Sequence, residues 1–254
     1  DPNNWDTYVL INVPEYKFRL FENGTKVMEF KVIVGKYKWQ TPIFSSTMKY
    51  IVINPTWNVP DNIARKEIIP HLVKDPVGYL KRHNMVVRRD YNIDSPPVDP
   101  RSVNWKKYLS KEWENKELPY KLIERASTRN ALGQVKFMFP NRFSVYMHDT
   151  NKKYLFNNAQ RSFSHGCIRL EKPFDLLRHI STNYTATPIE NPKEYLALLR
   201  RKKKRDTTYI NLVRTIPVHI VYLTAYVDED GVVRFFNDIY RYDAIQHVRG
   251  LGSI

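Results

Sequence analysis

The order of hydrophobic and polar residues predicts β-strands in the first 55 positions of the chain. Thr7–Asn12 is apolar and rich in β-branched residues, and apolar residues then alternate with charged ones, as in a half-buried strand. Asn23 and Gly24 form a tight-turn pair. We therefore expect Tyr16–Val34 to be a β-hairpin, followed by a short strand at Ile51–Ile53.

The pattern changes between residues 57 and 118, where short helical periods alternate with proline-rich loops. Asp61 is placed to cap a helix over Ile63–Leu72, and a second short helix is expected near Tyr79–His83. The region reads as an insertion between two β regions. The residues alone leave open whether it is a structural excursion or a lid over an active site, since lids are often irregular insertions.

The remainder of the chain returns to strands and then adds two helices and a hairpin. Strands are predicted at Gln134–Phe139 and Phe143–His148, and helices are predicted to begin at Pro173 and Pro192. A final hairpin is expected from Val218–Val227 and Val232–Phe236, on either side of a turn at Asp228–Gly231. The fold class is therefore mainly β with helices (α+β).

Length and charge narrow the class of protein. The 254 residues form one large domain or one domain with an insertion. The net charge of +15 favours anionic partners: nucleic acid, membrane headgroups or acidic cell-wall polymers. No nucleic-acid-binding motif is present, so we expect no nucleic-acid partner. The basic run Arg200–Arg205 is interpreted as a solvated helix end.

The single cysteine, Cys167, excludes an intramolecular disulfide. No run of 18 apolar residues occurs, so no transmembrane segment is expected. The sequence shows no signal peptide and opens mid-stream at Asp1, like a trimmed chain. The natural location therefore does not follow from the ends of this sequence.

The segment Ser164-His165-Gly166-Cys167 carries the candidate chemistry. A thiolate is a nucleophile, but a free cysteine is mostly protonated at neutral pH and needs a base. His165 lies two residues before the thiol, where an extended chain would place both side chains on one face. His148, at the end of a predicted strand, is the second candidate and would have a rigid mount.

Neighbouring residues fit supporting roles around these two histidines. Asp149, through its side chain or its backbone carbonyl, could hold the His148 imidazole in one tautomer. Ser164 could support the site through its hydroxyl, and the N–H groups of Gly166 and Cys167 could stabilise an oxyanion. Arg169 places a permanent cation two residues beyond the thiol, suited to a substrate carboxylate.

Two other interpretations of the same residues stay open at this point. A lone cysteine is most often a small buried hydrophobe. His148, His165 and Cys167 could also be three zinc ligands, but they lack the paired-cysteine or helical His-Glu spacing of zinc sites. We therefore expect no metal at this site.

The residues that carry the chemistry resemble the signature of the YkuD-type L,D-transpeptidase catalytic domain. That signature is a histidine, a gap of about fifteen residues, and Ser/Thr-His-Gly-Cys, as in His148 and Ser164–Cys167. Further segments resemble the larger YcbB-like Gram-negative subclass, although this chain has His165 where those proteins carry a serine. These segments are Asn54–Pro60, Ala64–Ile68, Tyr146–Thr150 and Tyr222–Tyr226.

The resemblance implies one catalytic domain over residues 1–254, with a β-sandwich core and residues 57–118 as a substrate-capping subdomain. It implies peptidoglycan cross-linking, and so a part in cell-wall biogenesis and cell shape, in the periplasm or cell envelope of a Gram-negative bacterium. Cys167 would attack a donor tetrapeptide stem and release D-Ala, and a diamino-acid side chain of a second stem would accept the acyl group. His148 would move the protons, His165 would support the thiolate, and Arg169 would bind a stem carboxylate. The resemblance also implies no cofactor, and carbapenem β-lactams as covalent inhibitors.

Two further functions are compatible with the sequence. An L,D-carboxypeptidase would form the same acyl-enzyme and use water as its acceptor. A non-enzymatic module would grip an anionic polymer through its positive charge, and an intact nucleophile–base pair argues against it.

Overall fold

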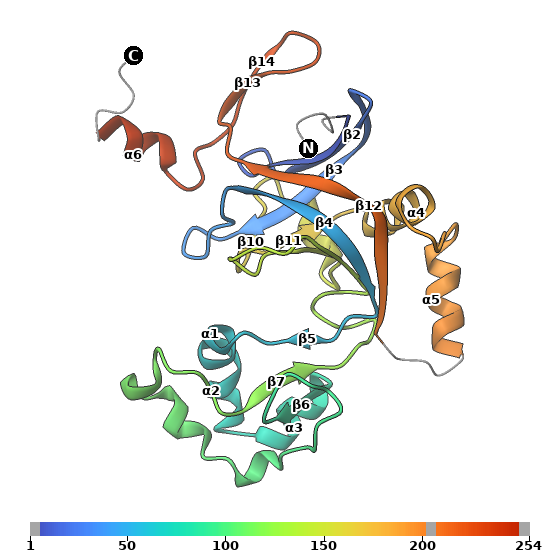
Figure 1. Ribbon diagram of the computed structural model, residues 1–254. Coiled ribbons are helices and arrows are strands. Elements are labelled where there is room, and N and C mark those ends of the chain that lie inside the picture. The colour runs from blue at the N-terminus through green and yellow to red at the C-terminus, as the bar shows by residue number, and fades with distance from the viewer. Residues whose placement is uncertain (1–5, 202–206, 249–254) are drawn as a thin grey trace. The chain divides into compact units, whose positions relative to one another are not determined.

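The computed structural model describes residues 6–201 and 207–248, and the chain separates into two compact units (Figure 1). The first, here called the sheet unit, contains the chain up to Ile53, the stretch from Val135 to residue 201, and the chain from Thr208. The second, the inserted unit, is built from Asn54–Gln134. It therefore contains the predicted lid region 57–118 and continues beyond it.

A nine-stranded sheet forms the sheet unit, with the strand order β10-β3-β11-β9-β8-β4-β12-β1-β2. An additional pairing joins the end strand β2 to β3, the second strand from the other end, so the sheet closes on itself. Closure removes most of the unpaired strand edge that an open sheet would expose. The strands are β1 (Thr7–Asn12), β2 (Lys17–Glu22), β3 (Thr25–Gly35), β4 (Phe44–Ile53), β8 (Val135–Met138), β9 (Met147–His148), β10 (Ser162–Ser164), β11 (Ile168–Leu170) and β12 (Thr208–Val221).

The first hairpin follows from local turn chemistry. Asn23 and Gly24 adopt positive φ angles of 50° and 73°, which a two-residue hairpin turn of the primed type requires. β2 and β3 pair in antiparallel fashion on either side of this turn. The predicted hairpin over Tyr16–Val34 is therefore confirmed.

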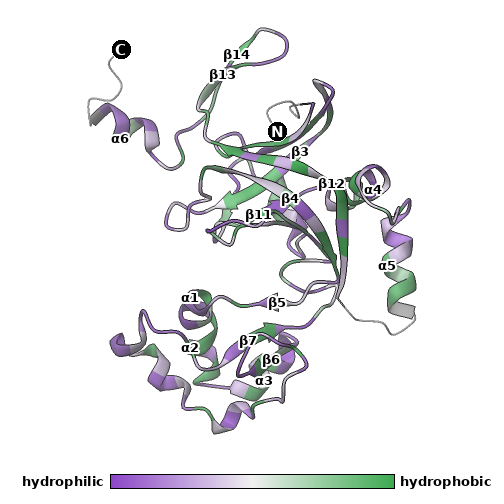
Figure 2. Cartoon of the chain, viewed as in Figure 1, coloured by the Kyte–Doolittle hydropathy of each residue, from purple (hydrophilic) through white to green (hydrophobic). Residues whose placement is uncertain are grey.

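The core of the sheet unit collects alternate residues of its strands. On the strands around the candidate site, the core side chains are Val32 and Val34, Phe137, Met147, and Ile168 and Leu170. Helix α4 (Pro173–Tyr184) packs its apolar side against this cluster, and α5 (Pro192–Arg201) adds Leu196. Each large apolar side chain contributes about 1.5–3 kcal/mol when fully buried. β12 also carries both kinds of residue: Figure 2 shows hydrophobic stretches on this strand that are interrupted by hydrophilic residues.

The inserted unit has its own core. A three-stranded sheet with the order β5-β7-β6 packs with the helices around a separate cluster that includes Ile69, Leu72 and Trp105. The elements are β5 (Trp57–Asn58), α1 (Asp61–Ile63), the π-helical turn η1 (Ala64–Ile68), α2 (Ile69–Leu72), α3 (Pro76–Arg82), β6 (Met85–Arg88), the 3₁₀ turns η2 (Pro100–Ser102), η3 (Trp105–Leu109) and η4 (Lys111–Trp113), and β7 (Lys121–Glu124).

The helix predicted over Ile63–Leu72 is present as α1, η1 and α2, but its predicted cap is wrong. Pro60 occupies the N-cap position, and no side chain caps the helix there. The Asp61 carboxylate instead accepts from the Leu118 N–H at 2.7 Å and from Lys121 Nζ at 3.0 Å. The Asp61 carboxylate therefore binds residues distant in sequence and does not form the expected hydrogen bond to a backbone N–H of its own helix.

Three strand predictions are wrong in their extent. β9 contains only Met147–His148, because Ser144 has a φ of 56° that breaks the extended chain. The predicted strand Val218–Val227 is two strands, since β12 ends at Val221 and β13 begins at Ala225. β4 is longer than predicted and begins at Phe44.

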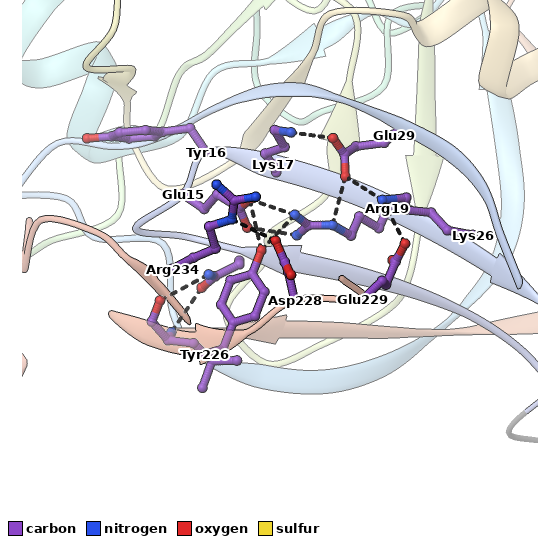
Figure 3. Close-up of polar contacts among 12 residues, drawn as sticks. Glu15, Tyr16, Lys17, Arg19, Lys26, Glu29, Tyr226, Asp228, Glu229 and Arg234 are labelled. Atoms are coloured by element: carbon purple, nitrogen blue, oxygen red, sulfur yellow. Dashed lines mark hydrogen bonds and ion pairs between the residues drawn. The ribbon is translucent and has the colours of Figure 1, made fainter. Parts of the chain in front are cut away.

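The terminal hairpin, β13 (Ala225–Val227) and β14 (Val233–Phe235), pairs as a separate ribbon, and α6 (Tyr242–Val248) follows it. An ion-pair network connects it to β2 and β3 (Figure 3). The Arg19 guanidinium forms two hydrogen bonds with Glu15, at 2.6 and 2.7 Å, and donates to the Tyr226 hydroxyl at 2.9 Å. A cleft of about 660 Å³ lies over this network. Its charged groups pair with one another, so the network serves to fix the hairpin.

Among the residues that the structure describes, no helix combines the length and apolar character needed to cross a membrane. Residues 202–205 of the basic run and residues 1–5 lie outside the described residues.

Candidate active site

Cys167 directly precedes β11, which lies between β3 and β9 in the closed sheet. The next residue, Ile168, donates its N–H to the Tyr146 carbonyl at 3.1 Å, which fixes the thiol-bearing turn to the neighbouring chain. The Cys167 side chain is half-buried, and its Sγ donates to the Ser144 carbonyl across 3.9 Å.

The Ser164–Cys167 segment is a tight bend built around Gly166. Gly166 has a φ of +114°, a region that is open chiefly to glycine. Its N–H donates to Ser164 Oγ at 3.1 Å, and the Ser164 hydroxyl donates to the Cys167 carbonyl at 2.6 Å. Ser164 thus holds the bend from within. Because the Gly166 N–H is directed to Ser164, the Cys167 N–H is the remaining donor of the predicted oxyanion pair.

This bend also changes the expected relation between His165 and Cys167. The two side chains were expected on one face of an extended chain, but residues 165–167 form a bend. The His165 ring lies against the Trp39 ring, with centroids 4.4 Å apart. The ammonium groups of Lys36 and Lys38 lie over that same indole, at 5.6 and 5.7 Å from its centroid. His165 therefore contacts the 36–39 loop.

His148 lies on β9, the strand adjacent to β11. Arg169 pairs with His148 in a parallel register, and Ile168 pairs with Met147. Residues at matching register positions share a face of the sheet, so His148, Arg169 and Cys167 share one face. Met147 and Ile168 point to the opposite face and into the core. Strand pairing therefore brings together the imidazole and the thiol, which the sequence separates by nineteen positions.

One hydrogen bond defines the state of the His148 ring. His148 Nδ1 lies 2.5 Å from the Asp149 backbone carbonyl. A carbonyl only accepts, so Nδ1 carries the proton and Nε2 has the lone pair that can accept one. The Asp149 side chain is engaged elsewhere, with the Thr150 N–H at 2.7 Å and Lys153 Nζ at 2.5 Å. The predicted orienting role of Asp149 therefore belongs to its backbone carbonyl.

Tyr146 is a site residue that the sequence reasoning missed. Its backbone N–H and its hydroxyl lie near the Cys167 sulfur, and both lower the pKa of that thiol. Its ring meets the His148 ring edge-on, with centroids 5.6 Å apart. The signal was present in the sequence, since Tyr146 lies two residues before His148 and so on the same face of an extended chain.

The electrostatics of the site favour a protonated thiol at rest. Burial raises the pKa of the Cys167 thiol above its ordinary value, while the Tyr146 donors and the nearby cations Arg169 and Lys136 oppose the shift. Burial dominates because it removes water from the anionic form. The sulfur therefore needs a base to take its proton when it reacts.

A second layer of hydrogen bonds holds the bend in place. Thr41 Oγ1 accepts from the Gly35 N–H at 2.9 Å and donates to the Gly166 carbonyl at 2.8 Å. The fully buried Tyr240 hydroxyl accepts from the Thr41 N–H at 3.1 Å and donates to the Gly35 carbonyl at 2.7 Å. A Cβ on Gly35 would lie 2.0 Å from the Trp39 carbonyl oxygen, so this position admits only glycine. Residues 35–41 thereby support the thiol-bearing bend from the side.

The described residues include no group of three or more His, Cys, Asp or Glu side chains that could hold a metal ion. His148, His165 and Cys167 are among those residues. Their geometry therefore does not form the zinc site considered from the sequence.

The closed sheet places the single thiol and the imidazole of His148 at neighbouring strands, with Nδ1 of that imidazole held by a backbone carbonyl. The family model for the YkuD L,D-transpeptidase catalytic domain matches residues 6–208. The chain therefore belongs to the YkuD family of L,D-transpeptidase catalytic domains.

A curated relative agrees with this family. A protein of Haemophilus influenzae that carries the name "Putative L,D-transpeptidase" is 31% identical over 236 residues, which cover 92% of this chain and 44% of the relative. The chain thus spans less than half the length of that protein.

Solved structures of the same family are also similar to this chain, at low sequence identity. L,D-transpeptidase 3 from Mycobacterium tuberculosis is 11% identical, with a TM-score of 0.36 over 85% of this chain and 61% of the other. The L,D-transpeptidase from Mycobacterium smegmatis is 11% identical, with a TM-score of 0.33 over 85% and 58%. An L,D-transpeptidase in complex with imipenem is 13% identical, with a TM-score of 0.34 over 85% and 59%.

Proposed function

We propose that this chain is the catalytic part of a peptidoglycan L,D-transpeptidase that works through a cysteine thioester. The observation that carries the proposal is the arrangement of Cys167 and His148 on one sheet face, with Nδ1 of His148 bonded to the Asp149 carbonyl. Membership of the YkuD family supplies the reaction class.

In the first step, the Cys167 sulfur attacks the carbonyl that precedes the terminal D-Ala of a donor tetrapeptide. A carbon–sulfur bond forms and the carbon–nitrogen bond breaks. His148 takes the thiol proton on Nε2 and delivers it to the leaving amine, so that D-Ala departs as a neutral amine. The raised pKa of the thiol is the reason that this base is needed.

In the second step, the side-chain amine of a diamino acid on another stem attacks the thioester. The new carbon–nitrogen bond forms, the carbon–sulfur bond breaks, and His148 transfers the amine proton back to sulfur. The Cys167 N–H would stabilise the oxyanion in both steps. Arg169 would bind a stem carboxylate, and His165, held on Trp39, would support the site electrostatically.

We further propose that the inserted unit, which contains residues 57–118, caps the bound substrate. The enzyme would act in the periplasm or cell envelope of a Gram-negative bacterium, where it would contribute to cell-wall biogenesis and cell shape. Carbapenems would acylate Cys167, because their strained carbonyl resembles the scissile amide.

The test is incubation of the purified protein with a disaccharide tetrapeptide, followed by chromatography and mass spectrometry. Cross-linked dimers together with free D-Ala support transpeptidation, whereas tripeptide without dimers assigns the L,D-carboxypeptidase reaction. Cys167→Ala is the matched control and should form neither product. If the wild type leaves the tetrapeptide unchanged but retains it on a binding assay, the protein is a binding module and the proposal is wrong.

A further inference from the structure

Lys136 is a cation on the same face of the sheet as His148, and the proposed mechanism gives it no contact with the substrate. It lies on β8, where antiparallel pairing places it opposite His148. The residues on either side of it, Val135 and Phe137, are fully buried in the core on the other face. The Lys136 side chain therefore projects onto the face that carries His148 and Cys167.

The environment of Lys136 brings its ammonium to the thiol. Nζ lies 5.3 Å from the centroid of the Tyr146 ring, and that same tyrosine acts on the pKa of the Cys167 thiol. β9 separates β8 from β11, so two strand spacings of about 4.8 Å each must be bridged. A long, flexible lysine side chain spans this distance. Accordingly, Lys136 and Cys167 each act on the pKa of the other.

The ammonium lacks a carboxylate partner among residues 6–201 and 207–248. The side chain is half-buried, and burial lowers its pKa. Removing an ammonium from water is unfavourable unless an anion compensates for it. The Tyr146 ring face compensates only in part. Lys136 is therefore a cation on the face of the nucleophile that can pair with an anionic group of a bound substrate.

The donor peptide brings such an anion close to the scissile bond. The carboxyl carbon of a terminal residue lies one residue beyond the carbonyl under attack, roughly 3–4 Å away along the backbone. We propose that Lys136 binds the free C-terminal carboxylate of the leaving residue of the donor peptide. This inference rests on the proposed function and specifies which bond the site cleaves: the last bond of a chain that ends in a free carboxylate.

Arg169 would not duplicate this role. It lies on β11, the strand that follows Cys167 directly, whereas Lys136 approaches from the other side of β9. The two cations therefore flank the sulfur from different strands. In this arrangement Lys136 binds the carboxylate of the leaving residue, and Arg169 binds a carboxylate elsewhere on the stem.

The experiment compares two donors that differ only at the terminus: the tetrapeptide acid and its C-terminal amide. Release of D-Ala or D-alaninamide gives kcat/KM for the wild type, Lys136→Met and Lys136→Arg. The wild type should prefer the acid by about ten- to hundredfold, the worth of one charge-assisted hydrogen bond. Lys136→Met should lose this preference, chiefly through a higher KM for the acid, and Lys136→Arg should retain most of it. Arg169→Met is the matched control and should retain the preference.

The outcomes separate this inference from the proposed function. A wild type that cleaves acid and amide equally overturns the inference without any variant, and so does a Lys136→Met protein that still prefers the acid. If Lys136→Met lowers kcat on both donors alike, and iodoacetamide alkylation of Cys167 needs a higher pH, then Lys136 acts on the thiol and the inference is wrong. A wild type that releases neither leaving group contradicts the proposed function itself.

Discussion

The Nδ1 atom of His148 lies 2.5 Å from the backbone carbonyl of Asp149, and this single contact determines which nitrogen of the imidazole can act as a base. The acceptor in this contact is a backbone carbonyl. The Asp149 carboxylate accepts instead from the Thr150 N–H. In the proposed mechanism, the side chains of Cys167 and His148 therefore react, and the Asp149 peptide group orients the imidazole.

Asp149→Asn tests that arrangement. An amide oxygen can still accept from the Thr150 N–H, and the backbone carbonyl is unchanged. We expect the rate of D-Ala release to fall by less than about tenfold, whereas loss of a true triad carboxylate costs about 10,000-fold. A loss of the larger size, measured by steady-state kinetics at neutral pH, would assign the orienting role to the carboxylate.

The two histidines near the thiol should differ in importance. His148→Ala removes the proposed base for the thiol proton, and should slow acylation by about 100- to 10,000-fold. His165→Phe keeps a ring against Trp39 and should slow it by less than about tenfold, since only an electrostatic contribution is lost. Stopped-flow acylation by a carbapenem measures both variants. Equal losses would mean that the base has been assigned wrongly.

The resting thiol should be unreactive at neutral pH. Burial raises the pKa of Cys167 above its ordinary value of 9.0. Because only the thiolate reacts with iodoacetamide, the alkylation rate without substrate should rise with pH through and beyond that value. A rate that reaches its plateau below about pH 7 would show a thiolate–imidazolium pair at rest instead.

Glu124, in the inserted unit, makes stability depend on pH. Burial raises its pKa to about 7, from an ordinary 4.5. The folded chain therefore keeps a proton that the unfolded chain releases above about pH 4.5, so stability falls as pH rises from there to about 7. Glu124→Gln keeps an acceptor for the Ala131 N–H. It should raise the free energy of unfolding by about 1–2 kcal/mol at pH 8, after allowance for solvent screening.

The same substitution should have little effect on stability at about pH 5, where the native carboxyl is protonated. Urea unfolding of the wild type and of Glu124→Gln at the two pH values measures the difference. A gain of the same size at both values would show that the effect does not come from ionisation.

The sequence predicted a structural feature correctly where that feature depends only on residues close together in the chain. The hairpin at Asn23-Gly24 follows from two residues that tolerate positive φ. Cys167 and His148 are recognisable because both residue types are reactive, and because a histidine followed at this spacing by Ser-His-Gly-Cys is a specific combination. The position of Asp61 shows the limit: a capping residue by sequence, it binds Leu118 and Lys121, which are distant in the chain.

The unpredicted part of the site depends on pairing between strands. Tyr146 and Lys136 reach the thiol because β8, β9 and β11 are neighbours in one closed sheet. The periodicity of the sequence does not predict that strand order. It indicates which face of a strand is buried, but not which other strand it pairs with. The bend at Gly166 likewise breaks the extended chain on which the spacing of His165 and Cys167 was interpreted.

The central claim is that Cys167 forms the acyl-enzyme, and intact-protein mass spectrometry after incubation with imipenem tests it most directly. Peptide mapping then locates the modification. We predict one adduct of the mass of the opened carbapenem, on the peptide that contains Cys167, and no adduct on Cys167→Ala. An unmodified wild-type protein, or an adduct that persists in Cys167→Ala, would contradict the account.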